Sequence, residues 1–214
     1  MKTYEYDFPK EFLDKHTNSI RYISIDIECT GLSLFRDRLC SVQIMINDND
    51  FVIIHFPKQN FTQSNNLSAL LTNDNILKYF HYARFDVAFI KKFLNITVNN
   101  FTCTKILSKI GRTYTEKHGL AELVRVVCDK NINKGSQTSY WGDTVLQPSQ
   151  KDYMCNDVRF LPQIAKYLLD IVNKENKTEL IKVSHDLLNI VIKYDLLGVN
   201  MLYYVGLNTN IGYL

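Results

Sequence analysis

The chain has 214 residues, 46% of them hydrophobic, and a formal net charge of +3 at pH 7. This length fits one domain, and thirteen tyrosines and twelve phenylalanines supply ample material for a packed core, so extensive disorder is not expected. A net charge this close to zero neither indicates nor excludes a nucleic-acid partner, because a protein can have a basic groove without a large positive net charge.

Cysteine usage and the N-terminal sequence bear on the compartment. The five cysteines contain no C-x-x-C pair, and the first residues (MKTYEYDF) include no apolar signal core. No apolar run approaches the length that spans a membrane. We therefore expect free thiols, a cytoplasmic location and no membrane partner.

The first strong strand pattern covers residues 22–27 and continues into a pair of acids. Isoleucines at 23, 25 and 27 alternate with Ser24, Asp26 and Glu28, so a strand directs both acids to one face. Two carboxylates on one face repel each other, and a divalent cation between them is the obvious counterion. The Asp-x-Glu pattern alone is a weak motif.

In the remaining sequence, predicted strands come first, strands and helices then alternate, and the last part is helical. We predict further strands at 40–46, 51–56, 76–81 and 98–103, and helices at 64–72, 85–94, 104–110, 118–129, 148–171 and 177–196. The turn cluster at 47–50 predicts a hairpin, and Pro162 should kink or break the helix that contains it. The order predicts an α/β domain with a mixed five-stranded sheet flanked by helices.

Two further acids stand at unusual positions. Asp157 lies on the apolar stripe of the 148–171 helix, four residues after Tyr153. Buried aspartates are rare unless they are paired or bind a metal, although capping or an ion pair with Arg159 would also explain Asp157. Asp86 falls in the first turn of a helix, where the helix dipole alone is a sufficient explanation, and His81 by itself fits a core histidine.

Together, these residues suggest a different chemistry. Acids from one strand and two helices form a ligand set for two hard cations, which clamp the attacking and leaving oxygens of a phosphodiester. Oxygen ligands without a Cys or His cluster favour Mg²⁺ or Mn²⁺ over Zn²⁺. The hydroxyl of Tyr153 could orient the attacking water.

Three segments carry a resemblance to a known family. Residues 26–28 (DIE), 81–86 (HYARFD) and 153–161 (YMCNDVRFL) resemble the three motifs of the DEDDy 3′–5′ exonucleases, and the lead-in at Ser139, Trp141, Leu146 and Gln150 resembles the ribonuclease D branch. Residues 36–40, 103–106, 112–115 with 118–120, and 195–198 are most similar to its short bacterial members, of the nano-RNase C type. Gln147-Pro148 replaces the usual Leu-Ser, which affects helix capping rather than chemistry.

The resemblance implies a ribonuclease H-like fold, one exonuclease domain over residues 1–214, and release of 5′-mononucleotides. It implies that Asp26, Glu28, Asp86 and Asp157 bind two divalent cations and that Tyr153 orients the water. Leu32 would be an apolar wedge against terminal bases, with a core leucine as the alternative. The other substrate-binding candidates in these motifs are Thr30, Gly31, His81, Arg84 and Lys105.

The substrate and the assembly also follow from the resemblance. We expect a metal-dependent exoribonuclease that prefers dinucleotides or very short RNA, in a ring-like homo-octamer. The alternatives are a ribonuclease D-like trimming enzyme, a DNA 3′–5′ exonuclease, or a non-catalytic nucleic-acid-binding scaffold, and the last is expected to have lost one or more acids. The aromatic tail (Tyr203, Tyr204, Tyr213) could supply contacts between protomers or simply pack.

Overall fold

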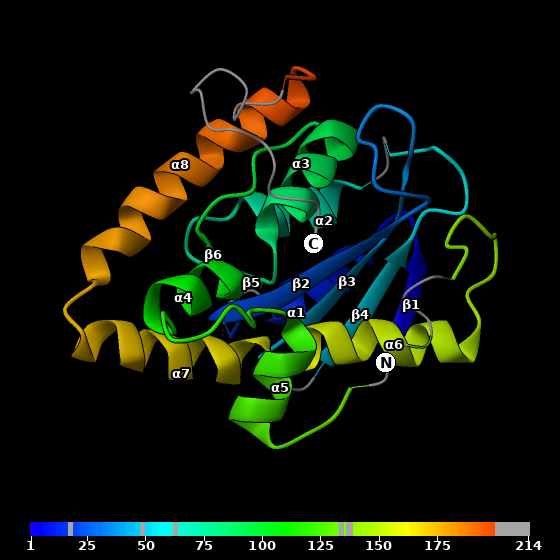
Figure 1. Cartoon of the computed structure of the whole chain (residues 1–214). Helices are drawn as coiled ribbons and strands as arrows, with labels where there is room; N and C mark the ends of the chain where they lie inside the picture. Colours follow the sequence, from blue (N-terminus) through cyan, green and yellow to red (C-terminus); the bar gives the residue numbers. More distant parts are fainter. Residues whose placement is uncertain (17–18, 48–49, 62–63, 133–134, 136–138, 200–214) are drawn as a thin grey trace.

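A computed structural model describes residues 1–16, 19–47, 50–61, 64–132, 135 and 139–199 (Figure 1). Its centre is a six-stranded sheet in the order β1-β4-β3-β2-β5-β6. Strands β2, β3 and β4 pair antiparallel, whereas β1 pairs with β4, and β5 with β2 and β6, in parallel. The strands are β1 (Lys2–Glu5), β2 (Tyr22–Cys29), β3 (Leu39–Ile46), β4 (Asp50–His55), β5 (Leu77–Phe80) and β6 (Phe101–Cys103).

The mixed sheet flanked by helices confirms the predicted fold class, with one correction to the strand count. The sheet has six strands instead of five because β1 adds to the edge of β4. Its four residues are mostly exposed and lack an apolar alternation, so the sequence pattern gave no strand signal. The tail aromatics Tyr203, Tyr204 and Tyr213 lie outside the described residues.

Helices cover both faces of the sheet (Figure 1). They are α1 (Lys10–His16), α2 (Asn65–Thr72), α3 (Ala83–Leu94), α4 (Thr104–Gly111), α5 (Leu120–Cys128), α6 (Pro148–Arg159), α7 (Leu161–Lys174) and α8 (Thr178–Leu196). Within the described residues, no helix is both long and apolar enough to cross a membrane.

The two faces of β2 have different partners. Ile23, Ile25 and Ile27 belong to the main core, together with buried residues of α2 and α3. Residues 24, 26 and 28 point to the opposite face, on which α6 packs. The alternation along one strand therefore separates the core from the acidic face.

The predicted helix at 148–171 is divided in two, as Pro162 required. Helix α6 ends at Arg159 and α7 begins at Leu161, with Pro162 in its first turn. Proline is tolerated there because the first amides of a helix have no intrahelical acceptor. The break lets α6 follow the sheet while α7 packs against α4 and α5 (Figure 1).

Candidate active site

Strand β2 presents Asp26 and Glu28 beside α6. One carboxylate oxygen from each, together with one from Asp157, lie within 4.8 Å of one another. The first of these acids also has a partner on β3: Gln43 lies opposite Asp26 in the strand register and donates its side-chain N–H to the carboxylate at 2.6 Å. Three acids predicted from two separate segments, β2 and α6, thus lie at one place.

Helix α6 adds the tyrosine. The hydroxyl of Tyr153 is hydrogen-bonded to the carboxyl group of Asp157, one helical turn later. The Tyr153 ring lies 6.0 Å from the Trp141 ring, centroid to centroid, at the edge of a small core that includes Cys40, Ile53 and Leu146. This packing fixes the ring while its hydroxyl faces the acids.

The fourth acid comes from the other face of the sheet. Asp86 sits in the first turn of α3 and is almost fully buried. Its carboxylate accepts a hydrogen bond from the backbone of Ile27 on β2. The residue before this helix, Tyr82, has a left-handed backbone (φ 71°), which is uncommon for a non-glycine residue and is found at functional sites. The sharp turn lets α3 start directly after β5.

Burial and mutual repulsion govern the electrostatics of the four acids. Burial, then the charges of Asp86, Asp157 and Glu28, raises the pKa of Asp26 well above its ordinary value. Burial likewise raises the pKa of Glu28 to about 9 and that of Asp86 well above the ordinary range, with further contributions from neighbouring acids. The hydroxyl of Tyr153 also has a raised pKa, first because of burial and then because of the charge of Asp157.

This donor set fits divalent cations. It consists of carboxylates, with no thiolate or imidazole in the cluster, and hard oxygen ligands suit Mg²⁺ or Mn²⁺. Asp86 is not one of the three acids within 4.8 Å of one another, but its charge contributes to the raised pKa values of Asp26 and Glu28. These buried acids repel one another, so they cannot all ionise without a positive charge between them. Asp26, Glu28, Asp86 and Asp157 therefore fit the two cations expected from the sequence.

A capping box holds the start of α6. The Gln150 side chain accepts a hydrogen bond from the Gln147 backbone N–H at 2.8 Å, and the Gln147 side chain accepts one from the backbone of residue 150. Gln150 also donates to the Tyr140 carbonyl at 3.1 Å. The Gln147-Pro148 pair thus preserves capping, and the hydrogen bond of Gln150 joins the loop before Trp141 to helix α6.

The loop after β2 carries three of the predicted substrate-binding residues. The hydroxyl of Thr30 accepts the Arg38 backbone N–H at 3.0 Å, and a Cβ added to Gly31 would lie 2.5 Å from an Asp37 oxygen. These two residues shape the loop. Leu32 is 84% exposed, which excludes the core alternative.

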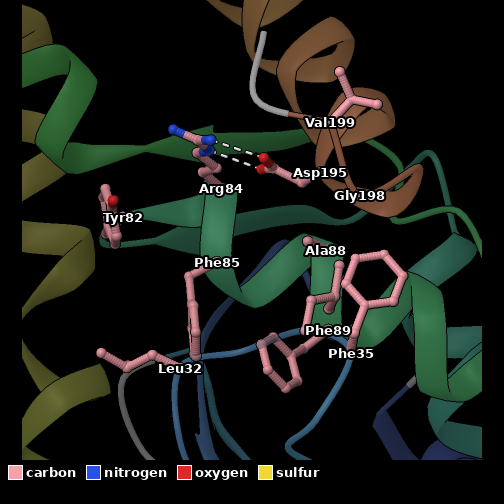
Figure 2. Close-up of a pocket in the computed structure, with 11 residues that line it drawn as sticks. Leu32, Phe35, Tyr82, Arg84, Phe85, Ala88, Phe89, Asp195, Gly198 and Val199 are labelled. Carbon is pink, nitrogen blue, oxygen red and sulfur yellow. Dashed lines mark hydrogen bonds and ion pairs between the residues drawn. The ribbon is translucent and has the colours of Figure 1, made fainter. Parts of the chain in front are cut away.

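The other predicted binding residues surround the start of α3. His81 Nδ1 lies 2.9 Å from the Thr104 hydroxyl, and the Lys105 ammonium sits 4.2 Å above the Tyr82 ring. Arg84 makes a bidentate ion pair with Asp195 of α8, with both N–O distances 2.7 Å. Arg84 and Leu32 both line a pocket of about 320 Å³ (Figure 2), whereas Lys105 lines a separate groove between α4 and α8.

Gln43 is the site residue that the sequence reasoning missed. A glutamine in the middle of the apolar run LCSVQIMI was the available signal, since buried glutamine requires a partner. Its Oε1 has no partner among the described residues, which leaves an acceptor on the acidic face. The cross-strand register that places it against Asp26 was not visible in the sequence.

Comparison with known proteins yields one family. The sequence profile described as 3′–5′ exonuclease matches residues 3–173. Brucella melitensis NrnC bound to pGG is 32% identical, with a TM-score of 0.85, over 92% of this chain and 93% of that one. The same protein with bound Mg²⁺ is 31% identical, with a TM-score of 0.84, over 92% and 94%.

Curated sequences also include 3′–5′ exonuclease relatives, at lower sequence identity. Ribonuclease D of Jannaschia sp. is 26% identical over 160 residues, which are 73% of this chain and 41% of the relative. The exosome complex component 10 homolog of Caenorhabditis elegans is 26% identical over 183 residues, 86% of this chain and 20% of the relative. The chain spans between 15% and 41% of the length of the curated relatives it matches.

Proposed function

Because the chain belongs to the 3′–5′ exonuclease family, we propose that it removes 5′-mononucleotides from the 3′ end of very short RNA, with a preference for dinucleotides. The observation that carries the proposal is the cluster of Asp26, Glu28 and Asp157 within 4.8 Å, with the Tyr153 hydroxyl bonded to the last of them. All four acids and the tyrosine are present, which argues against a non-catalytic scaffold.

Each residue has a role that follows from its position. The acids on β2, α3 and α6 would hold two divalent cations, which when bound would supply the positive charge that phosphodiester hydrolysis needs. Tyr153 is a phenol that keeps its proton at neutral pH, and burial raises its pKa further, so its hydroxyl can orient the attacking water. Gln43 fixes one carboxylate orientation of Asp26.

The surroundings support a short substrate. The pocket lined by Leu32, Phe35, Tyr82 and Phe85 offers an exposed apolar edge and aromatic faces on which bases can stack (Figure 2). At about 320 Å³ the pocket is small. The short ligand pGG in Brucella melitensis NrnC is consistent with such a substrate.

The proposal extends to the setting of the enzyme. Four of the five cysteines are buried free thiols and the fifth is half-buried, which fits a reducing cytoplasm. We propose a closed homo-oligomer, an octamer by resemblance, and one exonuclease domain over residues 1–214. These points rest on the resemblance and the chemistry of the chain.

Rates on a ladder of 5′-phosphorylated oligoribonucleotides from two to seven residues test the substrate. We expect the dinucleotide to be hydrolysed fastest, with mononucleotides as the only products, because a small site positions a single scissile phosphate best. Asp157→Asn, which keeps shape but loses charge, is the matched inactive control.

Other outcomes lead to the alternatives. Equal rates on two- and seven-residue RNA would favour a general exonuclease, and faster removal from a structured RNA 3′ end would favour a trimming enzyme. Preference for DNA of the same length would favour a DNA exonuclease, consistent with the 28% identity to DNA polymerase I of Aquifex aeolicus. Binding without hydrolysis in Mg²⁺ and Mn²⁺ would leave only the scaffold.

A further inference from the structure

Helix α8 carries an exposed apolar stripe with coiled-coil spacing. Six positions repeat at alternating steps of three and four residues, the last of them at the C-cap of the helix: Leu180, Val183, Leu187, Ile190, Tyr194 and Leu197. The five aliphatic members are between 45% and 77% exposed. Apolar residues with this 3-4 spacing are the signature of a helix that packs along another helix.

The stripe is separate from the residues that attach α8 to its own domain. Leu188 and Ile192 are the buried residues of this helix, and they face α3 and the core. In Figure 1, α8 runs along the outer edge of the molecule, and the labelled strands and helices lie to one side of it. The helix is therefore apolar on two faces, and the part of the chain that the structure describes covers one of them.

Antiparallel pairing of two copies of α8 aligns the stripe with itself. Around a two-fold axis between positions 187 and 190, Leu187 meets the partner's Ile190. The same register brings Val183 opposite the partner's Tyr194, and Leu180 opposite the partner's Leu197. Every layer of such a pair contains two apolar side chains, as an isologous interface requires.

The charges that flank the stripe agree with this register. Asp186 and Lys193 occupy equivalent flanking positions one heptad apart. In the antiparallel pair, Asp186 lies beside the partner's Lys193, and the two-fold axis generates the same contact a second time. The opposite flank carries Ser184 and Val191, which bring no like charges together. The flanks are thus complementary to a second copy of the same helix.

A groove next to the stripe offers additional contact area. It has a volume of about 400 Å³, and its lining includes Ile106 and Ile110 of α4 and Leu187 and Val191 of α8. A helix lying on the stripe would cover this groove as well. The groove is also lined by Lys105 and Lys109, but its surface is largely apolar, and an exposed apolar surface is typical of an interaction site.

We propose that α8 is a self-association surface, on which a second copy of this chain docks its own α8 in antiparallel orientation. The proposal deepens the homo-oligomer proposed above by naming the contact that joins two protomers. It does not depend on the exonuclease reaction.

Charge reversal tests the register in the full-length protein by analytical ultracentrifugation. Asp186→Lys places two lysines together at both symmetric contacts, and Lys193→Asp places two aspartates together, so each should weaken association about tenfold. The double variant Asp186→Lys/Lys193→Asp restores opposite charges and should restore the wild-type mass. Lys182→Asp, an exposed charge reversal on the same helix outside the stripe and its flanks, is the matched control.

Disulfide trapping tests the orientation independently. Leu187→Cys/Ile190→Cys should form a covalent dimer, because the two positions face each other across the pair. Leu180→Cys/Val183→Cys, equally exposed but not mutually facing, should not. Efficient trapping by Leu187→Cys alone would indicate parallel helices and overturn the proposed arrangement.

The remaining outcomes are also decisive. A wild-type protein that stays monomeric at all concentrations would overturn both the pairing and the assembly. If the protein is an oligomer whose association is unchanged by the charge reversals, and if no disulfide-trapped dimer forms, the α8 pairing alone would be overturned. Loss of the proposed RNA preference would leave the pairing untouched, since neither measurement uses activity.

Discussion

The carboxylates of the acid cluster repel one another electrostatically when no cation is bound. Asp26 and Glu28 both have raised pKa values because they are buried near Asp157 and Asp86. This arrangement costs folding free energy, as is common where function rather than stability selects the residues.

Asp157→Asn should therefore abolish hydrolysis without unfolding the protein. The substitution removes a cation ligand but also removes one of the repelling charges, so the melting temperature measured in chelator should stay equal or rise. Asp152→Asn on the same helix, which is exposed, should keep full activity. A large fall in melting temperature would mean that Asp157 is structural.

Tyr153→Phe isolates the hydroxyl, since the ring keeps its contact with Trp141. We expect kcat to fall on the order of 10²-fold or more with KM little changed, as for a positioned acid–base group. Tyr167→Phe, on the exposed side of α7, is the control. An unchanged kcat with a raised KM would reassign Tyr153 to substrate binding.

Gln43→Leu tests positioning of a cation ligand. Leucine has no side-chain N–H to donate to Asp26, so the Asp26 carboxylate loses the hydrogen bond that fixes its orientation. Activity should therefore fall roughly 10-fold. The concentration of Mg²⁺ for half-maximal rate should rise, which a purely structural role would not cause. Gln163→Leu, at an exposed site on α7, should change neither quantity.

At the scale of elements, strand β5 contains a charged residue where the sheet is buried. Lys78 is fully buried, and its ammonium donates to the Asn73 carbonyl at the end of α2. Burial lowers the pKa of Lys78 to about 8, from an ordinary value of 10.5. The charged form is therefore disfavoured in the native state.

This shift predicts a pH-dependent difference between the wild type and Lys78→Met. Between pH 8 and 10.5 the unfolded chain holds the Lys78 proton while the native state has lost it, so wild-type stability gains with rising pH. Relative to the variant, the gain should reach at most about 3 kcal/mol. Urea unfolding of both proteins at pH 7.5 and 10.5 measures it, and a constant difference would contradict the lowered pKa.

At the scale of the whole molecule, cation binding should couple activity to stability. Chelation should abolish hydrolysis, and either Mg²⁺ or Mn²⁺ should restore it. Because the unfolded chain has no assembled cluster, either ion should also raise the melting temperature in proportion to the logarithm of its concentration. Melting temperature and hydrolysis measured with Ca²⁺ distinguish cation binding from support of catalysis. Full activity in excess chelator would contradict the cation requirement.

Local patterns in the sequence determined much of this molecule. Period-two alternation identified the strand that carries Asp26 and Glu28, and Pro162 located the break between α6 and α7. The helical spacing that places Asp157 one turn after Tyr153 is also local. Such features can be predicted from the sequence because they depend on residues within a few positions of each other.

Tertiary structure decided what depends on distant neighbours. Strand β1 forms only because β4 pairs with it, and Gln43 contacts Asp26 only through the register of β2 and β3. The exposure of Leu32 and of the α8 stripe likewise depends on which surfaces the rest of the chain covers. A sequence specifies which residues are apolar, but burial is a property of the assembled fold, because it is set by contacts between segments far apart in the chain.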